Sequence, residues 1–136
     1  PNNGDWTQVV EVTTEGGYRM GNPDAPARLV EYASMTCPAC AAFAADGADL
    51  LTETYVRSGQ VSWEFRNFLL GGPDLAIALL TRCQPPAAFF RTIDQAFERL
   101  PDELARQTAG DISAQTGNRN SLSRPQSTAV LLFLWL

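Results

Sequence analysis

The sequence predicts a single α/β domain in which strands and helices alternate around one sheet. An apolar run over residues 28–34 comes directly before a helical pattern that extends to about residue 56, and a second strand pattern covers residues 61–69. A strand, a helix and a strand joined by short links form a parallel pair with a right-handed crossover. The 136 residues are enough for one domain with a substantial core.

The elements before this unit are short. Residues 7–13 alternate weakly around three valines and are predicted to form an edge strand, and Gly16-Gly17 marks a turn. Residues 21–26 contain two prolines, which cannot donate to a sheet ladder, so a loop is expected there. The strand at 28–34 is apolar on both faces apart from Glu31, which is typical of a buried strand.

The helical pattern starts at Pro38, and Gly47 is expected to weaken it and let it bend. Ser58-Gly59 ends this pattern. In the strand that follows, alternate positions put three apolar side chains on one face: Val61, Trp63 and Phe65.

Helices are expected in the second half of the chain. A short helix has an apolar face that includes Cys83, which is therefore predicted to be a buried structural thiol. The next helix has a core-facing apolar stripe formed by Phe89, Phe90, Ile93 and Phe97, and Pro101 opens a further helix. The apolar run from Thr128 to Trp135 is predicted to form a last strand.

The composition excludes several classes of function. There is no histidine and no lysine, so a histidine base, a histidine-ligated metal and a lysine Schiff base are all ruled out. Three cysteines without histidine make a poor zinc site, so no metal or other cofactor is expected. The net charge is -5 and the arginines are scattered, which argues against nucleic acid as a partner.

Neither end of the chain has a membrane signal. The longest apolar run, Ala129 to Leu136, is too short to span a bilayer, and no signal peptide is visible. The chain starts at Pro1 instead of methionine. Two explanations would account for a first residue other than methionine: cleavage of an upstream leader peptide, or an expressed fragment with a chosen start.

The motif Cys37-Pro38-Ala39-Cys40 lies at the predicted start of the first helix. Unpaired N–H groups and the positive dipole end of a helix favour a thiolate, and proline suits the first turn. We therefore expect Cys37 to be the nucleophile and the more buried Cys40 to be the resolving thiol. A static disulfide, two inert thiols and half of a metal site are the alternatives, and a disulfide over so short a span would stabilise little.

Together with the upstream loop Asn22-Pro23-Asp24-Ala25-Pro26, the strand and the motif resemble the DsbA-like thiol-disulfide oxidoreductases of the thioredoxin superfamily. The resemblance covers about residues 18–100. It implies a thioredoxin-like fold over residues 1–136, with a helical insertion at about 73–116. It also implies a periplasmic or otherwise exported enzyme that exchanges disulfides with reduced or misoxidised substrate proteins and with a redox partner protein. Glu31 matches a family acid that helps to move protons; the alternative is an acid at a strand edge that faces water.

The sequence departs from the family pattern in two places. Ala39 stands where many relatives have histidine, so the Cys37 thiolate should be less stabilised and the protein a weaker oxidant. The family also places a cis-proline opposite the two cysteines, and Pro125 is the only candidate in position; the alternative is an ordinary loop proline. The abrupt end at Leu136 leads us to expect a truncated or altered C-terminus.

The predicted function is therefore thiol-disulfide exchange through the Cys37–Cys40 motif. Two alternatives stay open: a degenerate thioredoxin-like module that binds client proteins without turnover, and a glutaredoxin- or thioredoxin-like reductase. The direction of exchange, the substrate and the oligomeric state do not follow from the sequence.

Overall fold

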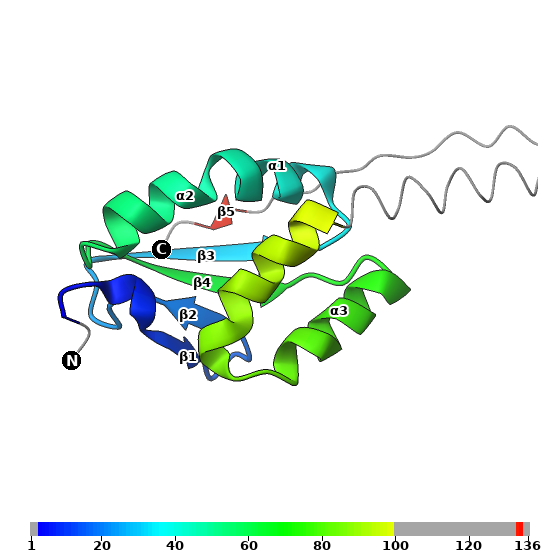
Figure 1. The fold of residues 1–136 in the computed structure, drawn as a ribbon, viewed down its shortest axis with the longest axis horizontal. Helices are drawn as coiled ribbons and strands as arrows, with labels where there is room; N and C mark the ends of the chain where they lie inside the picture. Colours follow the sequence, from blue (N-terminus) through cyan, green and yellow to red (C-terminus); the bar gives the residue numbers. More distant parts are fainter. Residues whose placement is uncertain (1–2, 100–132, 135–136) are drawn as a thin grey trace, which may run out of the picture.

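The computed structural model describes residues 3–99 and 133–134 of the chain. Its strands form one sheet in the order β1-β2-β4-β3-β5 (Figure 1). The strands are β1 (Val10–Val12), β2 (Tyr18–Met20), β3 (Ala27–Ala33), β4 (Val61–Asn67) and β5 (Phe133–Leu134). The β3–β4 pair is parallel, and the other pairs are antiparallel.

The described helical elements come before β1, between β3 and β4, and after β4. Before β4 they are η1 (Trp6–Gln8), α1 (Pro38–Asp46), α2 (Ala48–Leu50) and the π-helix η2 (Leu51–Val56). After β4 they are α3 (Gly72–Arg82), η3 (Pro86–Ala88) and a helix over residues 89–99.

The two central strands are confirmed, and the predicted first strand is shorter than expected, because Trp6–Gln8 forms a 3-10 helix. β1 is an edge strand, and β3 and β4 form the expected parallel pair, with Leu29 opposite Trp63. The sequence analysis missed β2, which has only three residues and pairs with both β1 and β4. The predicted last strand is described only at Phe133–Leu134, where it pairs with β3.

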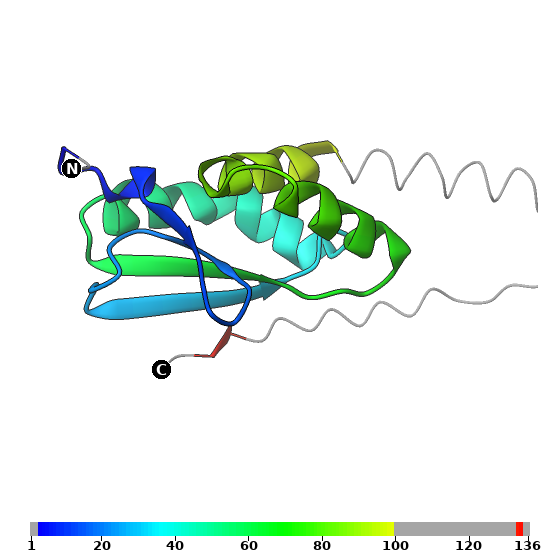
Figure 2. The same cartoon turned by 90° about the horizontal axis from the view of Figure 1, so that it is seen from below.

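The core lies between the sheet and helices that cover one of its faces (Figure 2). Phe89 is fully buried and stacks on Tyr18 of β2 with a centroid distance of 3.7 Å. Trp63 of β4 contacts both Phe43 of α1 and Phe90, at centroid distances of 6.3 Å and 4.9 Å. Residues from α1 and from the helix at 89–99 therefore meet over the same strand. The predicted apolar stripe of that helix lies in the hydrophobic core.

Gly47 interrupts the first long helical segment, as the sequence predicts. It is both the C-cap of α1 and the N-cap of α2. A Cβ atom at this position would lie 2.8 Å from two ring carbons of Phe43. The glycine thus leaves room for a core aromatic ring at the point where the helix changes.

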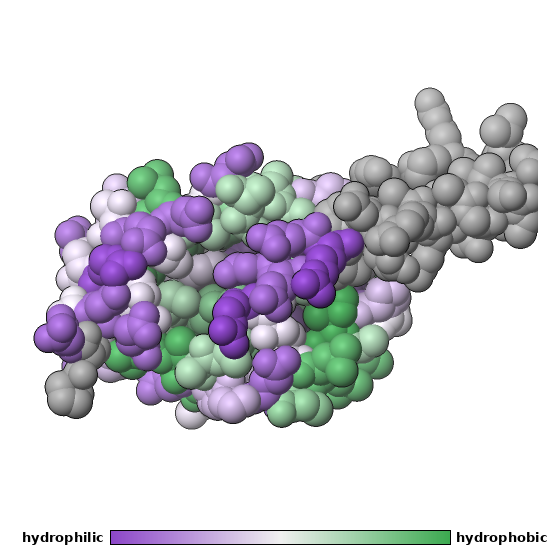
Figure 3. Space-filling model, viewed as in Figure 1, coloured by the Kyte–Doolittle hydropathy of each residue, from purple (hydrophilic) through white to green (hydrophobic). Residues whose placement is uncertain are grey.

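The orientation of α3 differs from the prediction. Its buried residues are Asp74, Ala78 and Thr81, whereas the predicted apolar face, including Leu80 and Cys83, is exposed. Figure 3 shows the resulting hydrophobic area over α3. The expectation of a buried Cys83 is therefore wrong, because polar contacts of Asp74 decide which side of α3 faces the protein.

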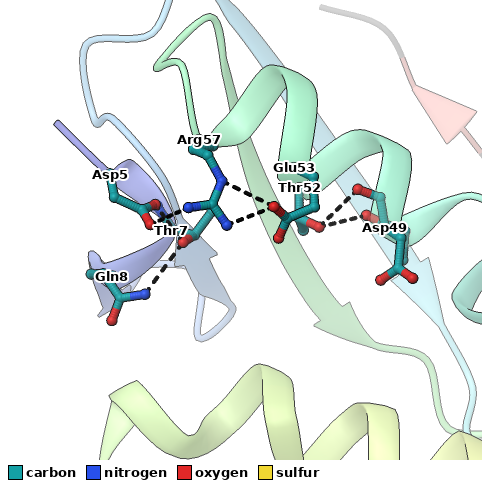
Figure 4. A network of polar contacts seen from close by, with 8 residues as sticks. Asp5, Thr7, Gln8, Asp49, Thr52, Glu53 and Arg57 are labelled. Carbon is teal, nitrogen blue, oxygen red and sulfur yellow. Dashed lines mark hydrogen bonds and ion pairs between the residues drawn. The ribbon is translucent and has the colours of Figure 1, made fainter.

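The N-terminal segment is tied to the end of η2 through Arg57. Its guanidinium group donates to Asp5 at 2.5 Å and to Glu53 at 2.6 Å (Figure 4). Thr7 also donates through its backbone N–H to Asp5 at 3.0 Å. These contacts hold the first residues against the helical layer.

The sheet face opposite the described helices carries charged side chains. Arg19 pairs with Glu11, and Arg66 donates to Glu64 at 2.7 Å and to the Tyr32 hydroxyl at 2.8 Å. We refer to these five residues as the charged sheet face. Successive side chains of a strand point to opposite faces of the sheet, so alternate residues contribute to the helix-covered core and to the charged sheet face.

Some predictions fall outside the described residues. These are the helix opening at Pro101, Pro125, and the part of the expected helical insertion beyond residue 99. Within the described ranges, no helix has both the length and the apolar character needed to cross a bilayer.

Candidate active site at Cys37 and Cys40

The start of α1 holds the two cysteines of the motif. Cys37 is the N-cap, with φ -88° and ψ 119°, and Pro38 lies in the first turn. The Cys37 N–H donates to the Ser34 carbonyl at 3.2 Å, and the Cys37 carbonyl accepts from Ala41 at 3.0 Å. An N-cap side chain lies close to the unpaired N–H groups of the first turn. The predicted position of Cys37 at the helix mouth is therefore confirmed.

The two thiols are free and interact with one another. Cys37 is 6% exposed and Cys40 is 2% exposed, which is the expected order. Burial, followed by a hydrogen bond with Cys37, raises the pKa of Cys40 to about 12.

Glu31 is a buried acid on β3, the strand that comes before the motif. It is 2% exposed, and its Oε2 accepts a hydrogen bond from Trp63 Nε1 at 3.0 Å. Burial raises the pKa of Glu31 to about 7; the Trp63 bond opposes this rise, and the charge of Asp94 adds to it. The alternative of an acid that faces water is therefore wrong. A carboxyl group that titrates near neutral pH is suited to proton transfer.

Electrostatic coupling links Glu31 to the thiols. The charge of Glu31 is among the causes that raise the pKa of Cys40, after burial and the Cys37 contacts. An ionised Glu31 thus opposes ionisation of Cys40, and a protonated Glu31 does not.

A cavity of about 440 Å³ lies beside Trp63, between α1–α2 and the helix at 89–99. Its lining includes Phe90 and Asp94. Loss of water around its carboxyl group, followed by the charges of Asp49 and Glu98, raises the pKa of Asp94 to about 6. The cavity therefore has an apolar base and an acidic rim.

Sequence reasoning missed Ser34 and Asp74, which hold the segment before Cys37. Asp74 is 1% exposed and accepts from the Ser34 hydroxyl at 2.9 Å. It also accepts from the Thr36 N–H at 3.2 Å and from the Thr36 hydroxyl at 3.0 Å. Asp74 follows Gly-Gly-Pro at a helix start, a signal for an N-terminal acid, but nothing local predicts its contacts with residues about forty positions earlier.

Cys83 does not join this site. Cys83 is the C-cap of α3, nine residues beyond Asp74, which corresponds to about 13 Å along a helix. Pro125 lies outside the described residues.

Known proteins are similar to this chain in sequence. The curated Disulfide bond formation protein D of Bacillus subtilis is 28% identical over 87 residues, which cover 61% of this chain and 39% of that protein. A Putative protein-disulfide oxidoreductase of Rickettsia bellii is 32% identical over 70 residues, or 52% of this chain and 27% of that protein. The chain thus spans less than half the length of these curated relatives.

Solved structures give the same fold. A protein-disulfide isomerase from Novosphingobium aromaticivorans matches with a TM-score of 0.62 and 34% identity, covering 64% of this chain and 44% of that one. Wolbachia pipientis alpha-DsbA1 matches with a TM-score of 0.59 and 26% identity, covering 76% and 56%. The thioredoxin-like fold is therefore confirmed.

A family model named Thioredoxin_4 and described as Thioredoxin matches residues 13–128, which include the whole Cys37–Cys40 motif. The chain therefore belongs to this thioredoxin family.

Proposed function

We propose that the protein is a thiol-disulfide oxidoreductase that exchanges disulfides with substrate proteins through Cys37 and Cys40. The observation that carries the proposal is the pair of buried thiols one helical turn apart at the mouth of α1, with Cys37 as the N-cap and Cys40 in the first turn. The oxidoreductase names of the relatives support the same chemistry.

The exchange proceeds in two steps from the reduced protein. The Cys37 thiolate attacks one sulfur of a disulfide, a mixed disulfide forms, and the other sulfur leaves and takes up a proton. Cys40 then loses its proton and attacks the Cys37 sulfur, which releases the second substrate thiol. Two electrons pass from the protein to the substrate, and the protein keeps a Cys37–Cys40 disulfide. The reverse sequence oxidises a substrate.

Glu31 is the proposed proton acceptor for the second step. Cys40, whose pKa is raised to about 12, needs a base nearby when it attacks. The carboxyl group of Glu31 ionises near neutral pH and is electrostatically coupled to Cys40. Its protonation during resolution would also remove the charge that opposes the Cys40 thiolate.

The remaining parts of the proposal extend beyond the described site. Pro125 is the candidate cis-proline that would hold a substrate peptide opposite Cys37. Reduced or misoxidised proteins are the proposed substrates, and a redox protein restores the pair after each cycle. An exported, periplasmic location fits this activity, because disulfides persist in oxidising compartments.

Titration of the reduced protein against glutathione disulfide tests the proposal. We expect Cys37 and Cys40 to form one disulfide reversibly, and the Cys37→Ser variant to lose this equilibrium while its circular dichroism spectrum stays that of the parent. Cys83→Ser is the matched control, because this thiol is exposed and lies away from the motif. An unchanged exchange rate in Cys37→Ser would refute the assignment of the nucleophile.

Two activity assays separate the alternatives. Oxidative refolding of a reduced protein measures transfer of a disulfide to substrates, and insulin reduction measures the opposite direction. A reductase performs the second assay well and the first poorly. A module that only binds client proteins performs neither, and that outcome would reject the proposed function.

A further inference from the structure

We propose that the cavity beside the redox motif is a subsite for a basic side chain of the substrate, an arginine or lysine a few residues from the substrate's reacting cysteine. This inference rests on the function proposed above and names a feature of its substrates. The cavity lies between α1–α2 and the helix at 89–99, which cover the same face of the sheet (Figures 1 and 2). Its volume of about 440 Å³ falls within the range of about 300–1,000 Å³ that is usual for ligand-binding cavities.

The interior of the cavity is apolar. Its aromatic lining consists of Trp63, Phe90 and Phe97. The part of the lining that comes from α1 consists of alanines alone, at positions 41, 44 and 45. A long aliphatic chain can therefore lie between these small side chains and the aromatic rings. Arginine and lysine bury their stems on apolar surface in this way while their charged heads stay in water.

The rim of the cavity carries three acidic side chains. Asp94 and Glu98 are one turn apart on the helix at 89–99, and Asp49 belongs to α2 on the other side. Within the described part of the chain, none of the three forms an ion pair, and no arginine lines the cavity. Like charges four residues apart on a helix destabilise it, and a bound cation would remove that cost.

An organic cation fits this lining better than a metal ion. Among the described residues, no three acidic or cysteine side chains are arranged so that they could hold one metal ion. Aromatic rings, in contrast, attract organic cations. An arginine or lysine side chain matches both parts of the lining, with its stem on the aromatic rings and its head at the carboxylates. Charge complementarity therefore identifies the occupant as a basic residue of a polypeptide.

The cavity begins one helical turn from the proposed nucleophile. Ala41 follows Cys40 directly, and its N–H donates to the Cys37 carbonyl at 3.0 Å. Along a helix that rises 1.5 Å per residue, Ala41 is about 6 Å and Asp49 about 18 Å from Cys37. An extended polypeptide advances about 3.3 Å per residue, so a side chain about two to five residues from the substrate cysteine reaches the cavity.

The rate at which the full chain reduces synthetic peptides tests the proposal. The probe is a symmetric peptide dimer, joined by one disulfide, with arginine three residues before and three residues after each cysteine. The reference dimer has citrulline, the neutral isostere of arginine, at these positions. Each dimer gives two peptide thiols and leaves the Cys37–Cys40 disulfide, with two electrons and two protons passing from the protein to the peptides. Ion pairs at the rim and contacts with aromatic rings should make the arginine dimer react about tenfold faster.

A charge variant separates the cavity from the overall negative charge of the protein. Asp94→Asn combined with Glu98→Gln removes two charges from the rim, and the two dimers should then react within twofold of one another. Asp24→Asn combined with Asp46→Asn is the matched control, because it removes the same charge from exposed acids outside the lining. This control should keep at least half of the parent's preference for arginine.

A variant of unchanged charge tests the cavity itself. Ala44→Leu places a larger side chain in the lining and should also bring the two rates within twofold. Ala42→Leu is its control, because Ala42 is an exposed residue of α1 outside the lining, and the preference for arginine should stay. Circular dichroism spectra establish that all four proteins fold like the parent.

Nuclear magnetic resonance locates the bound peptide without any exchange. With serine in place of cysteine, the arginine peptide should shift the backbone amide signals of Ala41, Ala44 and Asp94, and the citrulline peptide should not. Equal reduction rates for the two dimers, a preference that survives in the cavity variants, or unshifted signals would each overturn the inference and leave the proposed function intact. A parent protein that reduces neither dimer rejects the proposed function instead, and the amide signals then decide on the subsite separately.

Discussion

Trp63 donates its indole N–H to the buried carboxyl group of Glu31 across the parallel pair β3–β4, at 3.0 Å. The register puts Leu29 opposite Trp63 and Glu31 opposite Phe65, so the two bonded residues are diagonal neighbours on the helix-covered face. The same tryptophan ring lies against Phe43 and Phe90. The buried carboxyl group of Glu31 is thus held by a tryptophan of the aromatic core.

Replacement of Glu31 by Gln should change the pH dependence of stability. Burial raises the folded-state pKa of Glu31 to about 7, above its ordinary value of 4.5. The folded protein therefore holds this proton more tightly than the unfolded chain, so its contribution is fully present below pH 4.5 and is lost as pH rises through 7. The loss is roughly 3 kcal/mol. Urea unfolding of parent and Glu31→Gln between pH 4.5 and 8 measures it.

The expected result is that Glu31→Gln loses less stability than the parent over this range. Asp94→Asn is the control, because the charge of Asp94 contributes to the raised pKa of Glu31 and its own pKa is raised to about 6. It should reduce the slope only in part. Parallel curves for parent and Glu31→Gln would show that Glu31 is ionised in the folded protein as easily as in the unfolded chain.

The two thiols of the motif should differ strongly in reactivity. At pH 8, a thiol with a pKa of about 12 is an anion in roughly one molecule in ten thousand, so Cys40 should be nearly inert. In a Cys83→Ser background, we expect iodoacetamide to modify Cys37 at least tenfold faster than Cys40 in the folded protein. Peptide mass spectrometry after timed quenching gives both rates, and guanidinium-unfolded protein provides the reference in which the difference should disappear.

Gly47→Ala should destabilise the protein although alanine favours helices. The gain in helix propensity is about 1 kcal/mol, but the new Cβ would lie 2.8 Å from the Phe43 ring. Moving this ring away from Trp63 costs about 1–3 kcal/mol, so a net loss of about 1 kcal/mol is expected. Gly72→Ala is the control, because nothing lies within 4 Å of a Cβ there. Equal stabilisation of both variants in thermal unfolding would contradict this account.

Phe89→Ala should cost about 3–5 kcal/mol of unfolding free energy. The ring is 0% exposed and stacks on Tyr18, so its removal leaves a cavity at the centre of the core. Leu79→Ala is the contrasting variant: Leu79 is 57% exposed, and we expect a change within about 0.5 kcal/mol. Chemical denaturation measures the free energy of unfolding of the two variants. A large loss of unfolding free energy for Leu79→Ala would show that this face of α3 is covered in solution.

Much of the site follows from local sequence. The strand, the proline in the first helical turn and the spacing of Cys37 and Cys40 are short-range signals, and the structure puts the motif at the helix mouth as predicted. The break at Gly47 and the burial of Trp63 follow in the same way, from helix propensity and from strand alternation.

The errors arise where long-range contacts decide. α3 is apolar on two sides, and helical periodicity favoured the side with Leu80 and Cys83; the hydrogen bonds of Asp74 to Ser34 and Thr36 turn the other side inward. The two interpretations of Glu31 depended on whether its strand lies at an exposed edge or is covered by the rest of the fold. A single sequence does not contain the order of the strands in the sheet.

The charged sheet face limits which partners can approach the molecule from that side. Arg66 satisfies Glu64 and Tyr32 there, and Arg19 satisfies Glu11. An apolar segment that binds over these groups would remove water from them without providing hydrogen-bond donors or acceptors in return. This desolvation costs several kcal/mol per ion. A partner that binds tightly to this surface would therefore need complementary polar groups of its own. The charged sheet face thus disfavours non-specific association with apolar surfaces.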